Sequence, residues 1–169
     1  MGREVDMRAF KRVIQRIGRS MKEWVGGHTT SPPTPLRPKI LVNKSTVPIG
    51  TTKLTKTILN SELASSTEEY FTVASMPEFL AEGQAVANLT RPERIVIGTE
   101  KSAKGDYAFG VLKGLAEGSG GIRIIHTREA SSELGKLLSN AMLAQRLSSI
   151  NSLASLAEKF DNCDLLEVK

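Results

Sequence analysis

Apolar residues along this chain follow two patterns, steps of three and four residues and short continuous runs. The steps predict helices, and they occupy residues 7–24, 51–63, 78–86, 104–117 and 131–160. The runs are rich in β-branched residues and predict buried strands at 39–43, 71–74, 94–97 and 122–125. Because strands and helices alternate from residue 39 onward, the pattern predicts an α/β fold with a parallel sheet of about four strands. The crossover rule places the carboxyl ends of such strands at one edge.

The segment from Ser131 to Phe160 predicts a helix that is long for a globular domain. It contains no proline, and either Ser131 or Ser132 is expected to cap its first turn, where Glu133 would favour the helix dipole. Apolar and small residues occupy most of its circumference. That arrangement is typical of a helix buried against several neighbours, some of which could belong to another chain.

Lys136 and Asn140 lie four residues apart on this helix and therefore share one face. Two interpretations of the pair stay open. In one, the lysine extends to solvent and the asparagine bonds to nearby backbone; in the other, both side chains bind a ligand.

Residues 1–25 are interpreted as an amphipathic N-terminal helix, and residues 26–38 as a loop that holds four of the seven prolines. The helix could cover a sheet, or it could bind a membrane surface or a partner. Its apolar residues recur at steps of three and four, and basic residues occupy the other positions. The apolar residues are Phe10, Val13, Ile14, Ile17, Met21 and Trp24, and the basic ones are Arg8, Lys11, Arg12, Arg16, Arg19 and Lys22.

Composition narrows the classes of partner. The 169 residues are 40% hydrophobic and 24% charged, as in a soluble globular protein, with a net charge of +5. We expect neither a membrane nor a nucleic acid as a partner, because no apolar run is long enough to span a bilayer and aromatic residues are sparse. His28 and His126 lie apart, so no metal site is expected. The single cysteine, Cys163, excludes an internal disulfide and favours a cytoplasmic location.

Polar clusters follow the first two predicted strands, at the edge where α/β sheets bind ligands. Residues 44–50 supply hydroxyl groups and backbone donors beside a proline that fixes the turn. Glu78 and Glu82 lie four residues apart at a predicted helix start, hence on one face. A hydroxyl, a general base and an ammonium group could converge there on a substrate alcohol. Alternatively, Ser45 and Thr46 form a capping turn and the glutamates only complement a helix dipole.

Four stretches together carry a resemblance to a known family. They are KSTVPIG at 44–50, PEFLAEGQAV at 77–86, RPERIVIG at 91–98, and SSELGKLLSNAMLAQRLSSINSLASLAE at 131–158. In this order and at about this spacing they resemble the UDP-glucose/GDP-mannose dehydrogenase family of nucleotide-sugar dehydrogenases, and within it the UDP-glucose 6-dehydrogenases. The resemblance implies that residues 39–130 are the C-terminal half of a Rossmann-like NAD-binding domain. Residues 131–169 would be the region of the central helix through which the family dimerises.

The resemblance also implies NAD as the cofactor and UDP-glucose as the substrate, whose primary alcohol is oxidised to a carboxylate with two NAD. Thr46 would help to position a catalytic water, Glu78 would be the acid/base group, and Lys136 would stabilise the developing oxyanion. Ser45 and Glu82 would contact NAD. The residues that would bind the substrate are Glu78, Phe79, Leu80, Lys136 and Asn140.

The chain departs from the family's pattern in ways that affect its expected activity. It has no Gly-x-Gly-x-x-Gly fingerprint, which the family carries upstream of the matching stretches. Cys163 lies outside the Gly-Gly-Ser-Cys-Phe context of the family's nucleophile, and the C-terminal UDP-binding domain has no counterpart. We therefore expect a partial chain that is inactive alone. The alternative function is a non-catalytic interaction module, in which the 131–160 helix pairs with a second copy or with a full-length homologue.

Overall fold

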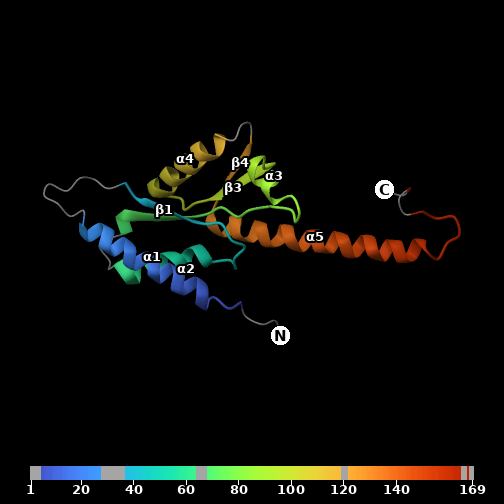
Figure 1. Ribbon diagram of the computed structural model, residues 1–169, viewed down its shortest axis with the longest axis horizontal. Coiled ribbons are helices and arrows are strands. Elements are labelled where there is room, and N and C mark those ends of the chain that lie inside the picture. The colour runs from blue at the N-terminus through green and yellow to red at the C-terminus, as the bar shows by residue number, and fades with distance from the viewer. Residues whose placement is uncertain (1–4, 28–36, 64–67, 119–121, 165–166, 168–169) are drawn as a thin grey trace.

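The computed structural model describes residues 5–27, 37–63, 68–118, 122–164 and 167. In chain order the elements are α1 (Arg8–Gly27), β1 (Lys39–Asn43), α2 (Thr51–Leu63), the short 3₁₀ helix η1 (Glu68–Tyr70), β2 (Phe71–Ser75), α3 (Ala85–Thr90), β3 (Arg94–Gly98), α4 (Ala103–Glu117), β4 (Arg123–Thr127) and α5 (Glu129–Ala157). All four predicted strands are present, and the α/β prediction is confirmed (Figure 1).

The sheet has the strand order β1-β2-β3-β4 and is mixed. β1 and β2 are parallel, and so are β3 and β4, but β2 and β3 meet antiparallel through one residue pair, Ser75 and Gly98. The prediction of a wholly parallel sheet is wrong at this pairing. A parallel crossover normally requires a helix that packs on the sheet and returns the chain to the starting edge. The β2–β3 connection holds only the six-residue α3, which has no buried residue.

Helices cover both faces of the sheet and form two core clusters. One cluster joins α1 and α2 to β2 through Ile14, Met21, Leu59, Leu63, Phe71 and Val73. The other joins α4 to the opposite face through Ala74, Ile97 and Leu112, with Ile40 and Val42 packed against it. The alternation follows from strand geometry, because successive side chains point to opposite faces.

α5 begins at the sheet and then extends well beyond it (Figure 1). Its first turns are packed, with Ser132, Glu133 and Lys136 buried, but every residue from Asn140 to Leu153 is exposed. The helix starts at Glu129 with Arg128 as its N-cap residue, so the prediction that Ser131 or Ser132 caps it is wrong. Ser132 lies within the helix, and its hydroxyl group donates to the Ser75 carbonyl of β2 rather than capping the first turn of α5. No helix in the described part of the chain combines the length and the apolarity needed to cross a membrane.

Lys56 ties α2 to two other parts of the fold. Its Nζ donates to a carboxylate oxygen of Glu100 at 2.6 Å and to one of Glu129 at 2.8 Å. Burial lowers the pKa of Lys56, but the two carboxylates outweigh burial and the net shift is upward. Burial likewise raises the pKa of Glu100, but hydrogen bonds from Lys56 and Ser102 outweigh it and the net shift is downward.

We expect Lys56→Met to lower the free energy of unfolding by about 1 kcal/mol at neutral pH. The depressed pKa of Glu100 gives stabilisation that is present above the ordinary value of 4.5 and is lost as the pH falls through the folded value. The raised pKa of Lys56 gives stabilisation that is present below 10.5 and is lost at higher pH. Urea unfolding of both proteins at several pH values should show the difference shrinking in acid. Lys113→Met, which breaks an exposed pair with Glu117, is the matched control and should cost less.

Candidate functional site

The carboxyl ends of β1 and β2 lie side by side and bring the two polar clusters together. Asn43 and Ser75 are paired in the parallel register, and the backbone N–H of Met76 donates to the Asn43 carbonyl at 2.9 Å. The loop with Ser45 and Thr46 therefore begins beside the segment with Glu78. This is the edge at which the sequence predicted a site.

α5 is joined to this edge by a buried pair of hydroxyl groups. The Ser75 hydroxyl donates to Ser132 Oγ at 3.1 Å, and the Ser132 hydroxyl donates to the Ser75 carbonyl at 3.2 Å. Ser132 also lies against Gly98 of β3, where a Cβ atom would come within 2.6 Å of the Ser132 Cβ. The start of α5 is thus fixed against two strands, one turn before Lys136.

Lys136 and Glu78 face each other at this edge. Lys136 is only 6% exposed, and its Nζ lies 3.6 Å from Glu78 Oε1. The other carboxylate oxygen of Glu78 accepts a hydrogen bond of 2.7 Å from the Leu80 N–H, which fixes its direction. Because 3.6 Å exceeds the usual hydrogen-bond length, both charged groups keep capacity to bond to a ligand.

Two more cations lie around this pair. The Phe79 ring centroid is 5.1 Å from Lys136 Nζ and 4.8 Å from the guanidinium carbon of Arg94. Such contacts hold an aromatic ring by its negative face. Burial lowers the pKa of Lys44, although the charge of Glu78 acts in the opposite direction. The site is therefore a carboxylate within a cationic surrounding, with an aromatic side chain beside it.

Glu82 does not share a helix face with Glu78, so that prediction is wrong. Residues 76–81 are not helical, and the helix predicted at 78–86 begins only at Ala85. Pro77 offers no backbone N–H, Glu78 bonds to the Leu80 N–H, and Gly83 adopts a φ of 77°, so the local chemistry favours turns. Glu82 lies exposed in the turn before α3.

Among the predicted residues not yet placed, only Leu80 has a described contact with the pair, the bond from its backbone N–H to Glu78. Ser45 and Thr46 are exposed in the loop after β1, and Leu80 is half-buried beside Phe79 in sequence. Asn140 lies one turn beyond Lys136 on α5 and is exposed. Cys163 is exposed beyond the end of α5. Among the described residues no group of three or more His, Cys, Asp or Glu could hold a metal ion.

Glu133 is the residue that sequence reasoning missed. It is 2% exposed, and its carboxylate accepts from the Gly50 N–H at 2.6 Å, the Thr52 N–H at 2.7 Å and the Thr52 hydroxyl at 2.7 Å. These donors lie at the N-terminus of α2, so the charge complements the dipole of α2 rather than that of its own helix. Glu133 therefore anchors α2 and the end of the 44–50 loop to α5.

We expect Gly98→Ala to lower the free energy of unfolding by about 1–3 kcal/mol, because the new Cβ would overpack the contact with Ser132. Its Cβ would also lie 2.9 Å from the Arg128 carbonyl, so the start of α5 would have to shift. Chemical denaturation measures the effect. Gly110→Ala is the control, since nothing lies within 4 Å of its Cβ position in α4, and it should not destabilise. Equal stability of the two variants would show that the start of α5 is not tightly packed on β3.

Comparison with known proteins places this geometry in a family. A sequence model of the NAD-binding domain of the UDP-glucose/GDP-mannose dehydrogenase family matches residues 1–114. The chain belongs to this family. The matched domain is the one that binds NAD in this family, so the cofactor of the domain is NAD.

Individual relatives agree with that assignment. The chain is 39% identical to a Caenorhabditis elegans UDP-glucose 6-dehydrogenase over 158 residues, which cover 93% of this chain and 31% of the relative. It is 43% identical over 121 residues to UDP-glucose 6-dehydrogenase 3 of rice (Oryza sativa subsp. japonica), which cover 71% of this chain and 25% of the relative. The chain therefore spans less than a third of the length of these relatives.

Solved structures of this family share the fold. A UDP-glucose dehydrogenase from Pyrobaculum islandicum superposes with a TM-score of 0.70 at 30% identity, over 90% of this chain and 31% of that one. A GDP-mannose dehydrogenase from Pseudomonas aeruginosa superposes with a TM-score of 0.74 over 98% of this chain and 34% of that one. The second is 22% identical and supports the Rossmann-like fold alone.

Proposed function

We propose that this chain supplies the acid–base part of a NAD-dependent dehydrogenase that oxidises the primary alcohol of UDP-glucose to a carboxylate. The observation that carries the proposal is the buried Lys136 ammonium group facing the Glu78 carboxylate at the carboxyl edge of the sheet. Family membership supports the reaction class, and the names of the relatives support the sugar nucleotide.

Oxidation of a primary alcohol removes a hydride from carbon and a proton from oxygen. Bound NAD would accept the hydride. Glu78 would take the proton, directly or through a water held by Thr46, and Lys136 would stabilise the negative charge that develops on the oxygen. Phe79, Leu80 and Asn140 would line the sugar. The ammonium group suits its role because burial makes its field stronger than it would be in water.

The residues at this edge fit a dinucleotide. The side-chain amide nitrogen (Nδ2) of Asn43, at the end of β1, is buried and has no hydrogen-bond partner within the described part of the chain. An unpartnered buried donor is suited to an oxygen of a bound ligand. Ser45 follows two residues later with an exposed hydroxyl group, and Glu82 would face the nicotinamide ribose. These residues would hold the cofactor at the carboxyl ends of β1 and β2.

NMR of the purified chain tests the site without requiring turnover. We expect NAD together with UDP-glucose to shift the amide signals of residues 44–46 and 78–80, and Lys136→Met to abolish the shifts. Lys159→Met, which removes an exposed lysine beyond α5, should leave them unchanged. Ligand shifts that survive Lys136→Met, or that lie only elsewhere, would contradict the proposal.

NADH formation from UDP-glucose and NAD then measures how much of the reaction this chain performs. We expect none from the chain alone, because the relatives contribute more than two thirds of their length from outside the matched region. We expect the rate of the Caenorhabditis elegans relative to change when this chain is added. An ordinary enzyme rate from the chain alone would overturn the expectation of an inactive part.

A second candidate function is assembly through α5. Its projecting part exposes large apolar side chains on consecutive turns, which are Leu138, Met142, Leu143, Leu147, Ile150, Leu153 and Leu156. Contiguous exposed apolar surface of this kind marks a protein interaction site. The partner would be a second copy of the chain, or a full-length homologue that presents the same helix.

A further inference from the structure

The Phe79 ring is contacted by two cations that come from different elements. The guanidinium carbon of Arg94, the first residue of β3, lies 4.8 Å from the ring centroid, and Lys136 Nζ, on α5, lies 5.1 Å from it. Both distances fall within the reach of about 6 Å at which a cation is attracted to an aromatic face. The ring therefore links β3 and α5 at the candidate site.

The segment that carries Phe79 has few backbone bonds of its own. Residues 76–81 lie outside the helices and strands, and Glu78 and Phe79 are half-buried. In the part of the chain that the structure describes, the one hydrogen bond of residues 77–80 runs from the Leu80 N–H to Glu78 and stays within the segment. Side-chain contacts, not backbone bonds, therefore join these residues to β3 and α5.

The guanidinium group of Arg94 has one other described partner, and that contact is weak. Its Nη1 lies 3.9 Å from a carboxylate oxygen of Glu93, beyond the usual length of a hydrogen bond, and the Glu93 side chain is 93% exposed. Ion pairs with such exposed groups contribute little to stability. Among the described contacts of Arg94, the Phe79 ring is therefore the one that uses its charge.

The place of the ring also affects the Lys136 ammonium group. That group lies 3.6 Å from the Glu78 carboxylate and 5.1 Å from the centroid of the Phe79 ring. Because Glu78 and Phe79 are consecutive residues, a movement of the ring would shift the carboxylate as well. The separation of the two charged groups thus depends on where the Phe79 ring is held.

We propose that Arg94 is a positioning residue of the candidate site, a role that rests on the proposed function. Its guanidinium group holds the Phe79 ring, and the ring in turn keeps the Lys136 ammonium group at its distance from Glu78. Arg94 acts through Phe79 and takes no part in the transfer of the proton. Removing its charge should therefore disturb the Lys136–Glu78 pair and weaken the binding of a sugar nucleotide there.

Substitutions of Arg94 test this role first in the chain without ligands. Arg94→Met removes the charge at a similar side-chain length, and we expect it to shift the NMR signals of the Phe79 ring and of the Lys136 side chain. Arg94→Lys restores a cation and should return most of both shifts, because a lysine is also attracted to an aromatic face. Unchanged Lys136 signals in Arg94→Met, or shifts of equal size in Arg94→Met and Arg94→Lys, would overturn the proposal.

Arg123→Met is the matched control. Arg123 is the first residue of β4 and the register partner of Arg94, so the substitution removes the same charge at the same position of the adjacent strand. Arg123 makes no cation–π contact with a described residue, and its loss should leave the signals of Phe79 and Lys136 in place. Shifts as large as those of Arg94→Met would mean that positive charge acts there at a distance, and would overturn the contact.

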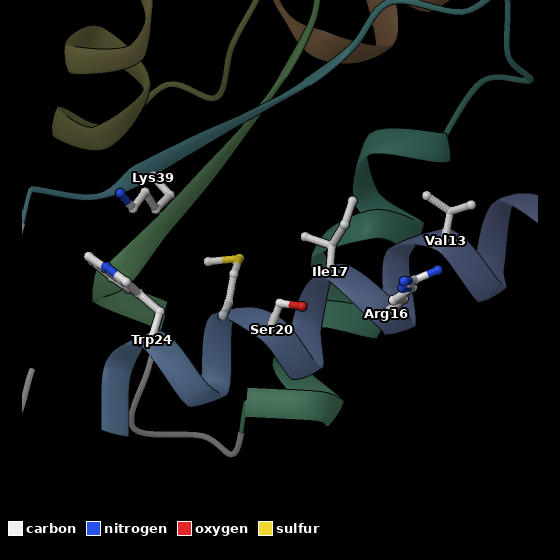
Figure 2. Close-up of a pocket in the computed structure, with 7 residues that line it drawn as sticks. Val13, Arg16, Ile17, Ser20, Trp24 and Lys39 are labelled. Atoms are coloured by element: carbon white, nitrogen blue, oxygen red, sulfur yellow. The ribbon is translucent and has the colours of Figure 1, made fainter. Parts of the chain in front are cut away.

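Another signal reports on the fold as a whole. Trp24, the single tryptophan of the chain, contacts the start of β1, the end opposite to the candidate site, with Lys39 Nζ 4.4 Å from its ring centroid (Figure 2). Its indole N–H signal should keep its place in Arg94→Met, and a shift there would show a general change of the fold and overturn a local role. If Arg94→Met does not fold, Phe79→Leu gives the test instead. It should move the side-chain signals of Arg94 and Lys136 together, and Arg94 signals that stay in place would overturn the proposal.

Affinity separates a positioning role from direct binding of the ligand. We expect Arg94→Met to weaken the binding of UDP-glucose in the presence of NAD about fivefold, and Arg94→Lys to weaken it by less than about twofold. In a chain that already carries Phe79→Leu, Arg94→Met should have no further effect, because the ring through which it acts is absent. An equal loss with and without the ring would mean that Arg94 contacts the ligand directly, and would overturn the proposal.

The proposed function and the role of Arg94 can fail separately. If UDP-glucose and NAD do not bind to the unchanged chain, the proposed function is wrong, while the ligand-free signals of Phe79 and Lys136 still decide whether Arg94 holds the ring. If the ligands shift residues 44–46 and 78–80, but Arg94→Met leaves the ring, the ammonium group and the affinity as they were, the proposed function stands and the role of Arg94 is refuted.

Discussion

Replacing Glu133 by glutamine is expected to lower the free energy of unfolding by about 1–3 kcal/mol, the cost of leaving a buried donor without its partner. The carboxylate accepts from Gly50, from the Thr52 backbone and from the Thr52 hydroxyl, all within 2.7 Å. A glutamine side chain has one oxygen and one NH₂ group, so it can accept from only part of this set. At least one buried donor of α2 would lose its partner, and the favourable charge at the N-terminus of α2 would be lost.

Urea denaturation measures the loss, and hydrogen exchange locates it. We expect the amides of Gly50 and Thr52 to exchange faster in Glu133→Gln, because the carboxylate protects them directly. Glu158→Gln, at the exposed end of α5, is the matched control and should change the stability by less than about 0.5 kcal/mol. Normal protection of both amides in the Glu133 variant would show that the anchor is not needed.

The consequence of losing Glu133 reaches the candidate site. Glu133 precedes Lys136 by one turn and holds the loop that contains Ser45 and Thr46. The same carboxylate thus sets the distance between the loop at the end of β1 and the helix that carries the lysine. We expect Glu133→Gln to weaken the ligand-induced amide shifts at 44–46 more than those at 78–80, because Glu78 is fixed by its own bond to Leu80.

Local patterns predicted the elements of this fold well. The run Lys39–Asn43 and the helix Thr51–Leu63 have the predicted bounds, because a continuous apolar run and apolar residues at steps of three and four are distinct patterns. The same approach failed at 78–86, where helix-forming residues follow Pro77. There the bond from the Leu80 N–H to Glu78 and the positive φ of Gly83 favour turns. Neither effect leaves a repeating pattern of apolar residues in the sequence.

The contacts that assemble the site could not be predicted from spacing. Glu133 and Thr52 are 81 residues apart, and Ser75 and Ser132 are 57 apart, so only the folded sheet brings them together. The sequence indicates that Glu133 favours the dipole of its own helix, α5. In the structure its carboxylate instead lies at the N-terminus of α2. The family resemblance, in contrast, assigns Lys136 and Glu78 to one site, and their charged groups lie 3.6 Å apart in the structure. Such a resemblance carries tertiary information that periodicity lacks.

In the dimer proposed to form through α5, replacing Leu147 by glutamate is expected to raise the dissociation constant at least about 100-fold and so to give a monomer. Leu147 is 64% exposed on the projecting part of α5, and Leu143 and Ile150 share its face at steps of four and three. Burying one leucine stabilises by about 1.5–3 kcal/mol. Because a two-fold dimer contains each residue twice, a single substitution removes this contribution twice and adds two buried charges. The lower bound of about 3 kcal/mol already corresponds to about two powers of ten in the dissociation constant.

Sedimentation velocity over a range of concentrations distinguishes a dimer formed through α5 from a monomer in which α5 stays exposed. Gln145→Glu adds the same charge about 160° around the helix from Leu147 and replaces a side chain that is already polar, so it should leave the dimer intact. A monomeric unchanged chain would refute self-association through α5 and leave the full-length homologue as the partner to be tested. If both variants dissociate the dimer, the helix is enclosed on all sides and the expectation of a one-sided interface is wrong. If only Leu147→Glu does so, one stripe through Leu143, Leu147 and Ile150 carries the interface, and the small residues on the far side remain free for a further neighbour.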